Sequence, residues 1–165
     1  MQRKTQHILA GVLVAGAMVI LVAAAATGQT PDQATRTDNQ GGITVKAIYV
    51  TSAYLKATPT NPLTGKVDLK RNVVFTVTLD THSGDLSGYD FVKNVTLRND
   101  RGQQLTPVGW VATADGSHHR AGGLLFPRTN QAGRAIDSQA RVLELVVRGL
   151  GRVTERVLRW TLPLE

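Results

Sequence analysis

Residues 72–80 read NVVFTVTLD, and this stretch decides the fold class. Apolar side chains occupy every second position, at Val73, Phe75, Val77 and Leu79. A period of two places these four side chains on one face of a strand, and the Val and Thr residues between them favour extended backbone. The stretch therefore predicts a β-strand with one face in a hydrophobic core.

Other short strands are predicted on both sides of this stretch, because apolar and polar residues alternate elsewhere too. They cover residues 43–49, 91–98, 104–111, 122–126, 141–147 and 153–162, with the polar segment 112–117 between two of them. Pro107 lacks the N–H that a central strand needs, so its strand is predicted at a sheet edge. About seven short strands without a later helical period are typical of an antiparallel β-sandwich of immunoglobulin-like class. A small closed barrel is the alternative, because alternation does not show whether a sheet closes.

A long apolar run precedes all of these strands. Residues 8–27 read ILAGVLVAGAMVILVAAAAT and carry no charge, which is about the length that a helix needs to cross a bilayer. Arg3 and Lys4 precede the run, so residues 1–7 are expected in the cytoplasm and the remaining chain outside it. We expect a transmembrane anchor in the cell membrane. A signal peptide is the alternative, because Ala23 to Ala25 fit a cleavage site, and the protein would then be secreted.

The chain after this run divides into a linker and one domain. Residues 29–42 read QTPDQATRTDNQGG, which is polar and lacks an apolar period. Such composition is typical of a tether, so a flexible linker is predicted over residues 28–42. Residues 43–165 are long enough for a single hydrophobic core and are predicted to form the β-sandwich domain.

Charge and cysteine content narrow the function classes. The formal net charge is +7, and without Arg3 and Lys4 there remain 17 of the 19 Lys and Arg residues against 12 Asp and Glu. A basic exported domain is attracted to anionic lipids, cell-wall polymers or an acidic protein partner. Nucleic acid is not expected as a partner, because the basic residues are not interleaved with aromatic ones. The chain has no Cys, which excludes disulfides, thiolate ligands and cysteine nucleophiles.

Three histidines near predicted strand ends form the candidate site. His82 begins the polar loop after the central strand, and His118 and His119 begin a later strand. Loops gather at the two ends of a sandwich, so His82, Asp85 and one of the paired histidines could meet there. Two imidazoles and a carboxylate suit copper or zinc. Turn formation by hydrogen bonds to the backbone is the alternative role of these residues.

Two segments around these histidines resemble a recurring pattern in uncharacterised extracytoplasmic β domains of bacteria and archaea. They read LDTHSGDLSGYD (79–90) and VGWVATADGSHHRAGGLLFP (108–127), and the pattern is T-H-S-x-D-L, a later Trp, a His pair and G-x-L-x-F. The matching residues are Thr81, His82, Ser83, Asp85, Leu86, Trp110, His118, His119, Gly122, Leu124 and Phe126. The resemblance implies a β domain outside the cytoplasm and implies no activity.

No catalytic motif accompanies these features. There is no G-x-S-x-G elbow and no glycine loop of the phosphate-binding type, so we expect a protein that is not an enzyme. The C-terminal hairpin carries five arginines and is predicted to form a basic tip; these are Arg141, Arg148, Arg152, Arg156 and Arg159. We expect a membrane-anchored, non-catalytic binding or accessory domain that contacts a protein partner or an envelope component. A copper- or zinc-binding extracytoplasmic domain is the alternative.

Overall fold

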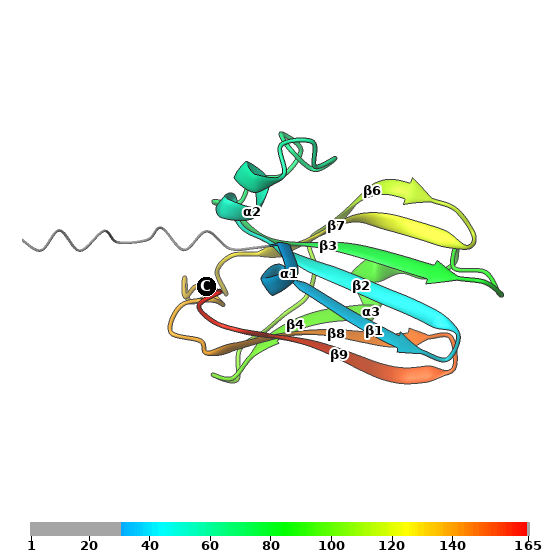
Figure 1. Cartoon of the computed structure of the whole chain (residues 1–165). Helices are drawn as coiled ribbons and strands as arrows, with labels where there is room; N and C mark the ends of the chain where they lie inside the picture. Colours follow the sequence, from blue (N-terminus) through cyan, green and yellow to red (C-terminus); the bar gives the residue numbers. More distant parts are fainter. Residues whose placement is uncertain (1–30, 165) are drawn as a thin grey trace, which may run out of the picture.

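The computed structural model describes residues 31–164 and shows two antiparallel sheets that face each other (Figure 1). The first sheet contains, in spatial order, β1 (Thr35–Gln40), β2 (Ile43–Val50), β3 (Asn72–Thr81), β7 (His119–Pro127) and β6 (Gly109–Asp115). The second contains β5 (Gln104–Leu105), β4 (Val95–Asn99), β8 (Val142–Leu150) and β9 (Val153–Thr161). Three short helices are present among the described residues: α1 (Pro31–Ala34), α2 (Ser52–Ala57) and α3 (Phe91–Asn94). The prediction of an all-β sandwich is confirmed, and the separate sheets decide against the closed barrel.

The predicted leader over residues 8–27 lies outside the described residues. Within residues 31–164, none of the helices has the length and apolar character needed to cross a bilayer.

The inner face of β3 forms the centre of the core, as its alternation predicts. Val73, Phe75, Val77 and Leu79 are at most 1% exposed. The Phe75 ring stacks on Tyr49 of β2 at 5.1 Å and meets Trp160 of β9 at 4.9 Å between ring centroids. Aromatic pairs at these distances contribute more than their buried area alone, and here they join the two sheets.

The outer face of the first sheet is covered by α2 and the following loop, residues 51–71. Leu63 from this loop is fully buried and lies against Gly123 of β7, where a Cβ atom would come within 2.9 Å of the Leu63 side chain. Val74, on the outer face of β3, belongs to the same small cluster. The outer face of β3 is therefore buried at Val74, whereas Thr76 and Thr78 are half-buried and Asp80 is exposed, and alternation alone does not reveal this partial cover.

The prediction of a flexible linker over residues 28–42 is wrong for residues 31–40. Thr35 to Gln40 pair with Ile48 to Ile43 along the whole of β1. Backbone pairing needs no apolar side chains, so a polar edge strand gives no hydrophobic signal.

Two shorter segments also differ from the prediction. Residues 112–115, predicted as part of a polar loop, continue the edge strand β6. Residues 91–94 form α3 in place of the start of a strand, because the Asp90 carboxylate caps the helix by accepting the N–H groups of Val92 and Lys93. The predicted edge position of the segment around Pro107 is confirmed, since β5 and β6 on either side of it are edge strands.

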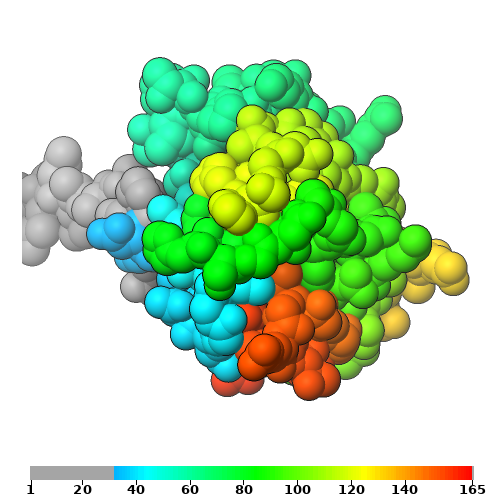
Figure 2. Space-filling view, turned by 90° about the vertical axis from the view of Figure 1, so that its right-hand side faces the viewer, coloured from blue at the N-terminus to red at the C-terminus, as the bar shows by residue number. Residues whose placement is uncertain are grey.

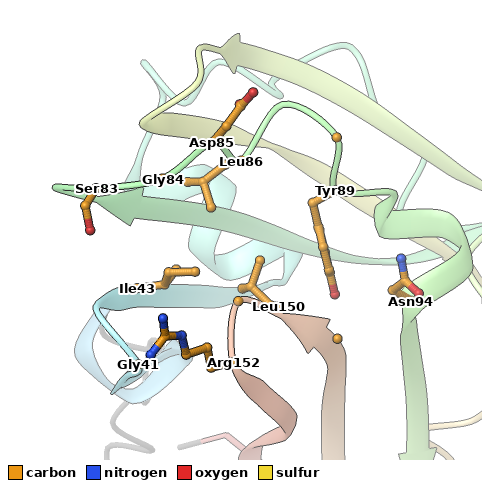
Figure 3. Close-up of a pocket in the computed structure, with 13 residues that line it drawn as sticks. Gly41, Ile43, Ser83, Gly84, Asp85, Leu86, Tyr89, Asn94, Leu150 and Arg152 are labelled. Atoms are coloured by element: carbon orange, nitrogen blue, oxygen red, sulfur yellow. The ribbon is translucent and has the colours of Figure 1, made fainter.

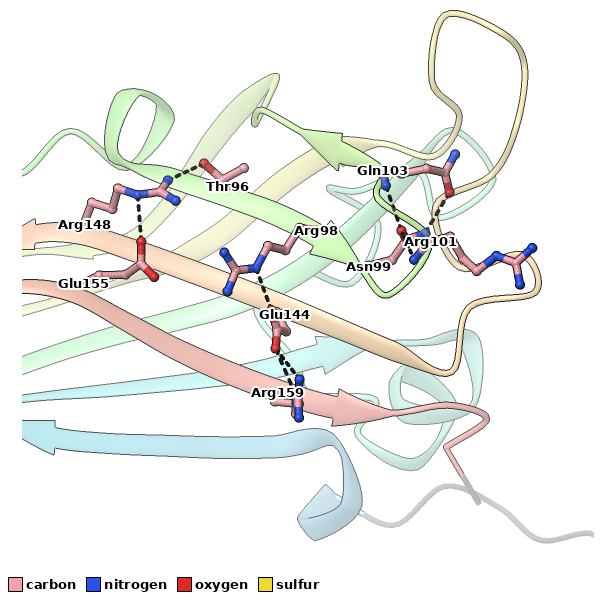
Figure 4. A network of polar contacts seen from close by, with 9 residues as sticks. All are labelled: Thr96, Arg98, Asn99, Arg101, Gln103, Glu144, Arg148, Glu155 and Arg159. Carbon is pink, nitrogen blue, oxygen red and sulfur yellow. Dashed lines mark hydrogen bonds and ion pairs between the residues drawn. The ribbon is translucent and has the colours of Figure 1, made fainter.

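The outer face of the second sheet carries alternating charges that pair with one another (Figure 4). Glu144 on β8 lies between Arg98 and Arg159, with N···O distances of 2.6 and 2.8 Å. The hydrogen bond from Arg98 is the main reason why the pKa of Glu144 lies below its ordinary value. Partial burial of the carboxylate opposes this effect, and the hydrogen bond from Arg159 adds to it. Arg148 pairs likewise with Glu155 at 3.1 Å and donates to Thr96.

Of the five arginines predicted to form a basic tip, three are paired with carboxylates, namely Arg148, Arg156 and Arg159, whereas Arg152 at the β8–β9 turn is not. Arg156 and Arg159 do lie on opposite faces of β9, and Arg156 is the one that points inward.

Arg156 of β9 connects the two sheets from within the core. Its side chain is fully buried, donates to the Asp38 carboxylate, and also donates to the carbonyls of Gln40 and Ile43 at 2.9 and 3.3 Å. These partners belong to β1, β2 and the turn between them, whereas Arg156 belongs to the edge strand of the other sheet. One guanidinium therefore joins the edges of both sheets.

Replacing Arg156 with Ala is expected to lower the free energy of unfolding by about 3–5 kcal/mol, because the change removes the cation that is paired with the partly buried Asp38 carboxylate and bonded to two carbonyls. Urea denaturation measures this. The control Arg159→Ala removes an arginine that is 65% exposed and leaves Glu144 paired with Arg98, so its loss should stay below about 1 kcal/mol. Equal losses for the two variants would show that Arg156 does not carry this role.

Candidate functional site

Four connecting segments gather at one end of the sandwich, where β3 ends and β7 begins. They are the turn at residues 41–42, the loop 82–90, the turn 116–118 and the turn 151–152, and we call this region the histidine end. Figure 2 looks onto it, and the cyan, green, yellow and orange segments lie together there. All three histidines of the candidate site lie on this end and are exposed.

The loop 82–90 is fastened to the turn that carries the paired histidines. The Thr81 N–H donates to the His118 carbonyl at 3.0 Å, and the Leu86 N–H donates to the Ser117 carbonyl at 2.7 Å. The Thr81 hydroxyl also donates to the Gly42 carbonyl at 3.0 Å, which joins the loop to the β1–β2 turn. The two segments of the predicted site are therefore neighbours in space.

Arg120 of β7 holds the same loop from beneath. Its guanidinium donates to the carbonyls of Leu86 and Tyr89 at 2.9 and 2.7 Å and pairs with Asp115 at 2.6 Å. It also lies 5.2 Å from the centre of the Phe91 ring, an attractive cation–π distance. The Arg120 side chain is only 8% exposed, so the loop rests on a buried cation.

The four predicted site residues are brought to one end but are not joined in one group. The hydrogen bonds from the hydroxyl and backbone N–H of Ser87 hold the pKa of Asp85 below its ordinary value. His119 pairs with Asp80, its register partner on β3. Within residues 31–164, no group of three His, Cys, Asp or Glu side chains is placed to hold a metal ion. Metal binding by His82, Asp85 and His118 or His119 stays a prediction.

A pocket of about 700 Å³ opens at the histidine end (Figure 3). Ile43, Leu86 and Leu150 supply apolar walls, and Arg152 stands beside them. Gly41, Gly84, Gly149 and Gly151 all have positive φ, so tight turns bring bare backbone to the rim. The pocket therefore combines apolar surface, exposed peptide groups, the cation of Arg152 and the carboxylate of Asp85.

Tyr89 forms another wall of this pocket. Its hydroxyl donates to the Arg148 carbonyl at 2.9 Å, and burial raises its pKa, so the group is a neutral donor at ordinary pH. The ring also packs edge-on against Phe91, with the centroids 5.2 Å apart. Both contacts fix the position of the wall before any ligand arrives.

The residues of the recurring sequence pattern separate into two kinds. Thr81, Leu86, Leu124 and Phe126 are buried. Trp110 stacks on Phe91 at 3.8 Å and needs Gly122 opposite, since a Cβ there would lie 2.6 Å from the indole. The others, His82, Ser83, Asp85, His118 and His119, are exposed. The first kind belongs to the core and to the support of the loop 82–90, and the second kind lies on the surface of the histidine end.

The sequence interpretation missed Arg120, Tyr89 and Arg152. For Arg120 a signal was present, because it continues the alternation of Phe126, Leu124 and Gly122 and so had to point inward. Arg152 was predicted only as part of a basic tip; its place at the pocket depends on the β8–β9 turn lying beside the β1–β2 turn, which the sequence pattern does not report.

Replacing Arg120 with Lys should loosen the loop without unfolding the core, because a point charge cannot reach three partners as a planar guanidinium does. Loss of one hydrogen bond to a charged donor costs about 1.5–3 kcal/mol, so exchange of the Leu86 amide should accelerate roughly tenfold to a hundredfold. Hydrogen exchange measures this, with the amides of β3 as the internal control. Unchanged protection at Leu86 would contradict this role of Arg120.

Comparison of the chain with protein-family models, with curated proteins and with solved structures finds no match. Its function has to be inferred from its own residues and their geometry.

Proposed function

We propose that this chain is a binding module that is anchored in the membrane and lies outside the cytoplasm. In this proposal it has no catalytic activity, and its sandwich is of the immunoglobulin-like class. Its histidine end contacts a protein partner or an envelope component. The single observation that supports this is the pocket at that end, whose walls are held by two buried arginines. Arg120 fixes the loop that carries Leu86 and Tyr89, and Arg156 fixes the turn that carries Gly41 and Ile43.

Burying two guanidinium groups needs a reason, because removing a charge from water carries a large free-energy penalty. Here each buried arginine bonds to the carbonyls of a surface segment, which orders that segment in advance. A surface ordered before binding loses less conformational entropy when a partner arrives. The arrangement is typical of recognition loops held on a rigid scaffold.

The chemistry of the pocket indicates what it could bind. Among the described residues, Arg152 makes no hydrogen bond or ion pair, so its guanidinium is available to an acidic group. Ile43 and Leu150 offer apolar contact beside it. An acidic side chain next to an apolar one, presented by a protein partner, would satisfy both.

A single cysteine at the pocket tests the proposal, because the chain has no Cys of its own. With Ser83→Cys, a thiol-reactive cross-linker in native membranes should give one discrete product. The additional change Arg152→Glu should reduce its yield roughly tenfold or more through like-charge repulsion. Lys46→Cys, on the outer face of the first sheet, is the control and should give no such product. Equal products from both cysteine positions, or no product from either, would sink the proposal.

Copper or zinc binding is the second candidate, because Asp85 and His118 interact electrostatically at the same end. Under the first proposal, protein purified without an affinity tag should contain no stoichiometric copper or zinc, and His118→Ala should leave the metal content unchanged. Metal analysis after exposure to micromolar copper or zinc measures this. One equivalent of metal, lost in both Asp85→Ala and His118→Ala, would favour the second candidate.

A further inference from the structure

A second pocket, of about 570 Å³, lies at the opposite end of the sandwich. The β4–β5 turn supplies Arg101 and Gln103, and the loop 128–141 supplies Arg134, Ser138 and Gln139. Each of these side chains can donate a hydrogen bond, and no Asp or Glu lines the pocket. Two guanidinium groups with neutral donors suit an anion with several oxygens.

The two arginines of this pocket are available. Among the described residues, the Arg101 and Arg134 side chains make no hydrogen bond or ion pair, and both residues are exposed. In Figure 4 the Arg101 side chain extends away from the ion pairs of the sheet.

The nearest carboxylates are already used by other groups. Asp100 accepts the N–H groups of Arg141 and Val142, and Asp137 accepts from Arg128 and the Tyr49 hydroxyl. Partial burial acts to raise the pKa of Asp100, but the hydrogen bonds from these two N–H groups outweigh it and hold the pKa below its ordinary value.

The walls of this pocket are fixed by one buried asparagine. The Asn99 amide donates to the Ile136 carbonyl and to the Gln103 side chain, both at 2.7 Å, and so joins the turn to the loop. Its carbonyl oxygen accepts the N–H groups of Arg101 and Gln103 at 2.9 and 3.0 Å. Gln139, at the rim, has a φ of 58°, a left-handed conformation that is uncommon outside glycine. The pocket is therefore formed in advance of any ligand.

This pocket lies at the end where α1 begins. The Trp160 indole donates to the Ala34 carbonyl at 2.6 Å, and the Leu162 N–H donates to the Arg141 carbonyl at 2.8 Å, so α1 and the loop 128–141 meet the same end of β9. Only residues 28–30 separate α1 from the predicted anchor over 8–27. An extended chain of that length spans about 10 Å at most. The anchor therefore places this end next to the membrane surface.

Unpaired positive charge is concentrated at the same end. Among the described residues, six Lys and Arg side chains without a hydrogen bond or ion pair come from segments at this end: Lys56, Lys66, Lys70, Arg101, Arg134 and Arg141. The unpaired ones elsewhere in residues 31–164 are Lys46 and Arg152. The end nearest the predicted anchor is thus the one that an anionic surface attracts.

We propose that the Arg101–Arg134 pocket binds the phosphate group of an anionic phospholipid in the membrane that holds the anchor. The surrounding lysines face the headgroups of neighbouring lipids. This proposal rests on the anchoring that forms part of the proposed function. It adds a defined lipid contact, which fixes how the domain stands on the bilayer.

The test uses the full chain in lipid nanodiscs made of phosphatidylcholine alone or mixed with phosphatidylglycerol. A fluorophore on Ala132→Cys, in the loop 128–141, reports its distance to acceptor-labelled headgroups by energy transfer. Transfer should rise in the anionic discs and fall again at high salt. Arg101→Gln and Arg134→Gln should each lower the ratio of docked to undocked domains roughly fivefold. Lys46→Gln removes an unpaired positive charge from outside both pockets, so it is the matched control and should leave energy transfer unchanged.

Three other outcomes would overturn the lipid proposal in different ways. Protein that fails to stay with discs of either composition contradicts the anchoring itself. Protein that stays in both kinds of disc with equal energy transfer contradicts only the lipid contact. If inorganic phosphate perturbs a Ser138→Cys label in an Arg101-dependent manner while lipid composition has no effect, the pocket takes a free phosphate and the lipid is excluded as the source.

Discussion

Two buried arginines determine the form of the end at which binding is proposed. Arg120 and Arg156 both project inward from strands whose other inward residues are apolar, and both donate to backbone carbonyls of segments that leave the core. Each such bond gives a carbonyl a charged donor, which makes a stronger hydrogen bond than a neutral donor does. The arginines therefore satisfy the backbone and shape the surface at once, so neither can be replaced by an apolar residue without loosening a loop.

Much of the fold could be predicted from the alternation of apolar residues, because burial on one face of a strand imposes a period of two. This succeeded for β3 and for the hairpin of β8 and β9. It failed for β1, whose polar side chains face solvent at an edge while its backbone pairs fully with β2. It failed for α3 because a single capping carboxylate, Asp90, decided between helix and strand.

The candidate site could be predicted only in part, for a related reason. The sequence showed that His82 and His118 follow and precede strands, which allowed them to share an end, and the structure places them on the same one. The distances between side chains depend on hydrogen bonds such as Leu86 N–H to the Ser117 carbonyl, and no periodicity reports those. Arg120 and Arg156 were readable as inward residues from their register, yet a charged residue at a core position was interpreted as part of a surface.

The two proposed contacts are separated by the length of the strands that connect them. β3 has ten residues and runs without interruption from one end of the sandwich to the other, which at about 3.3 Å per residue corresponds to roughly 30 Å. Because the inner face of β3 is buried and its Phe75 packs on Trp160 from the opposite sheet, the core fixes this spacing. A lipid contact at the end nearest the predicted anchor would therefore hold the histidine end at a fixed height above the headgroups. A partner that itself sits in or on the same membrane would then meet the pocket without a search over many orientations, which lowers the entropic cost of the encounter.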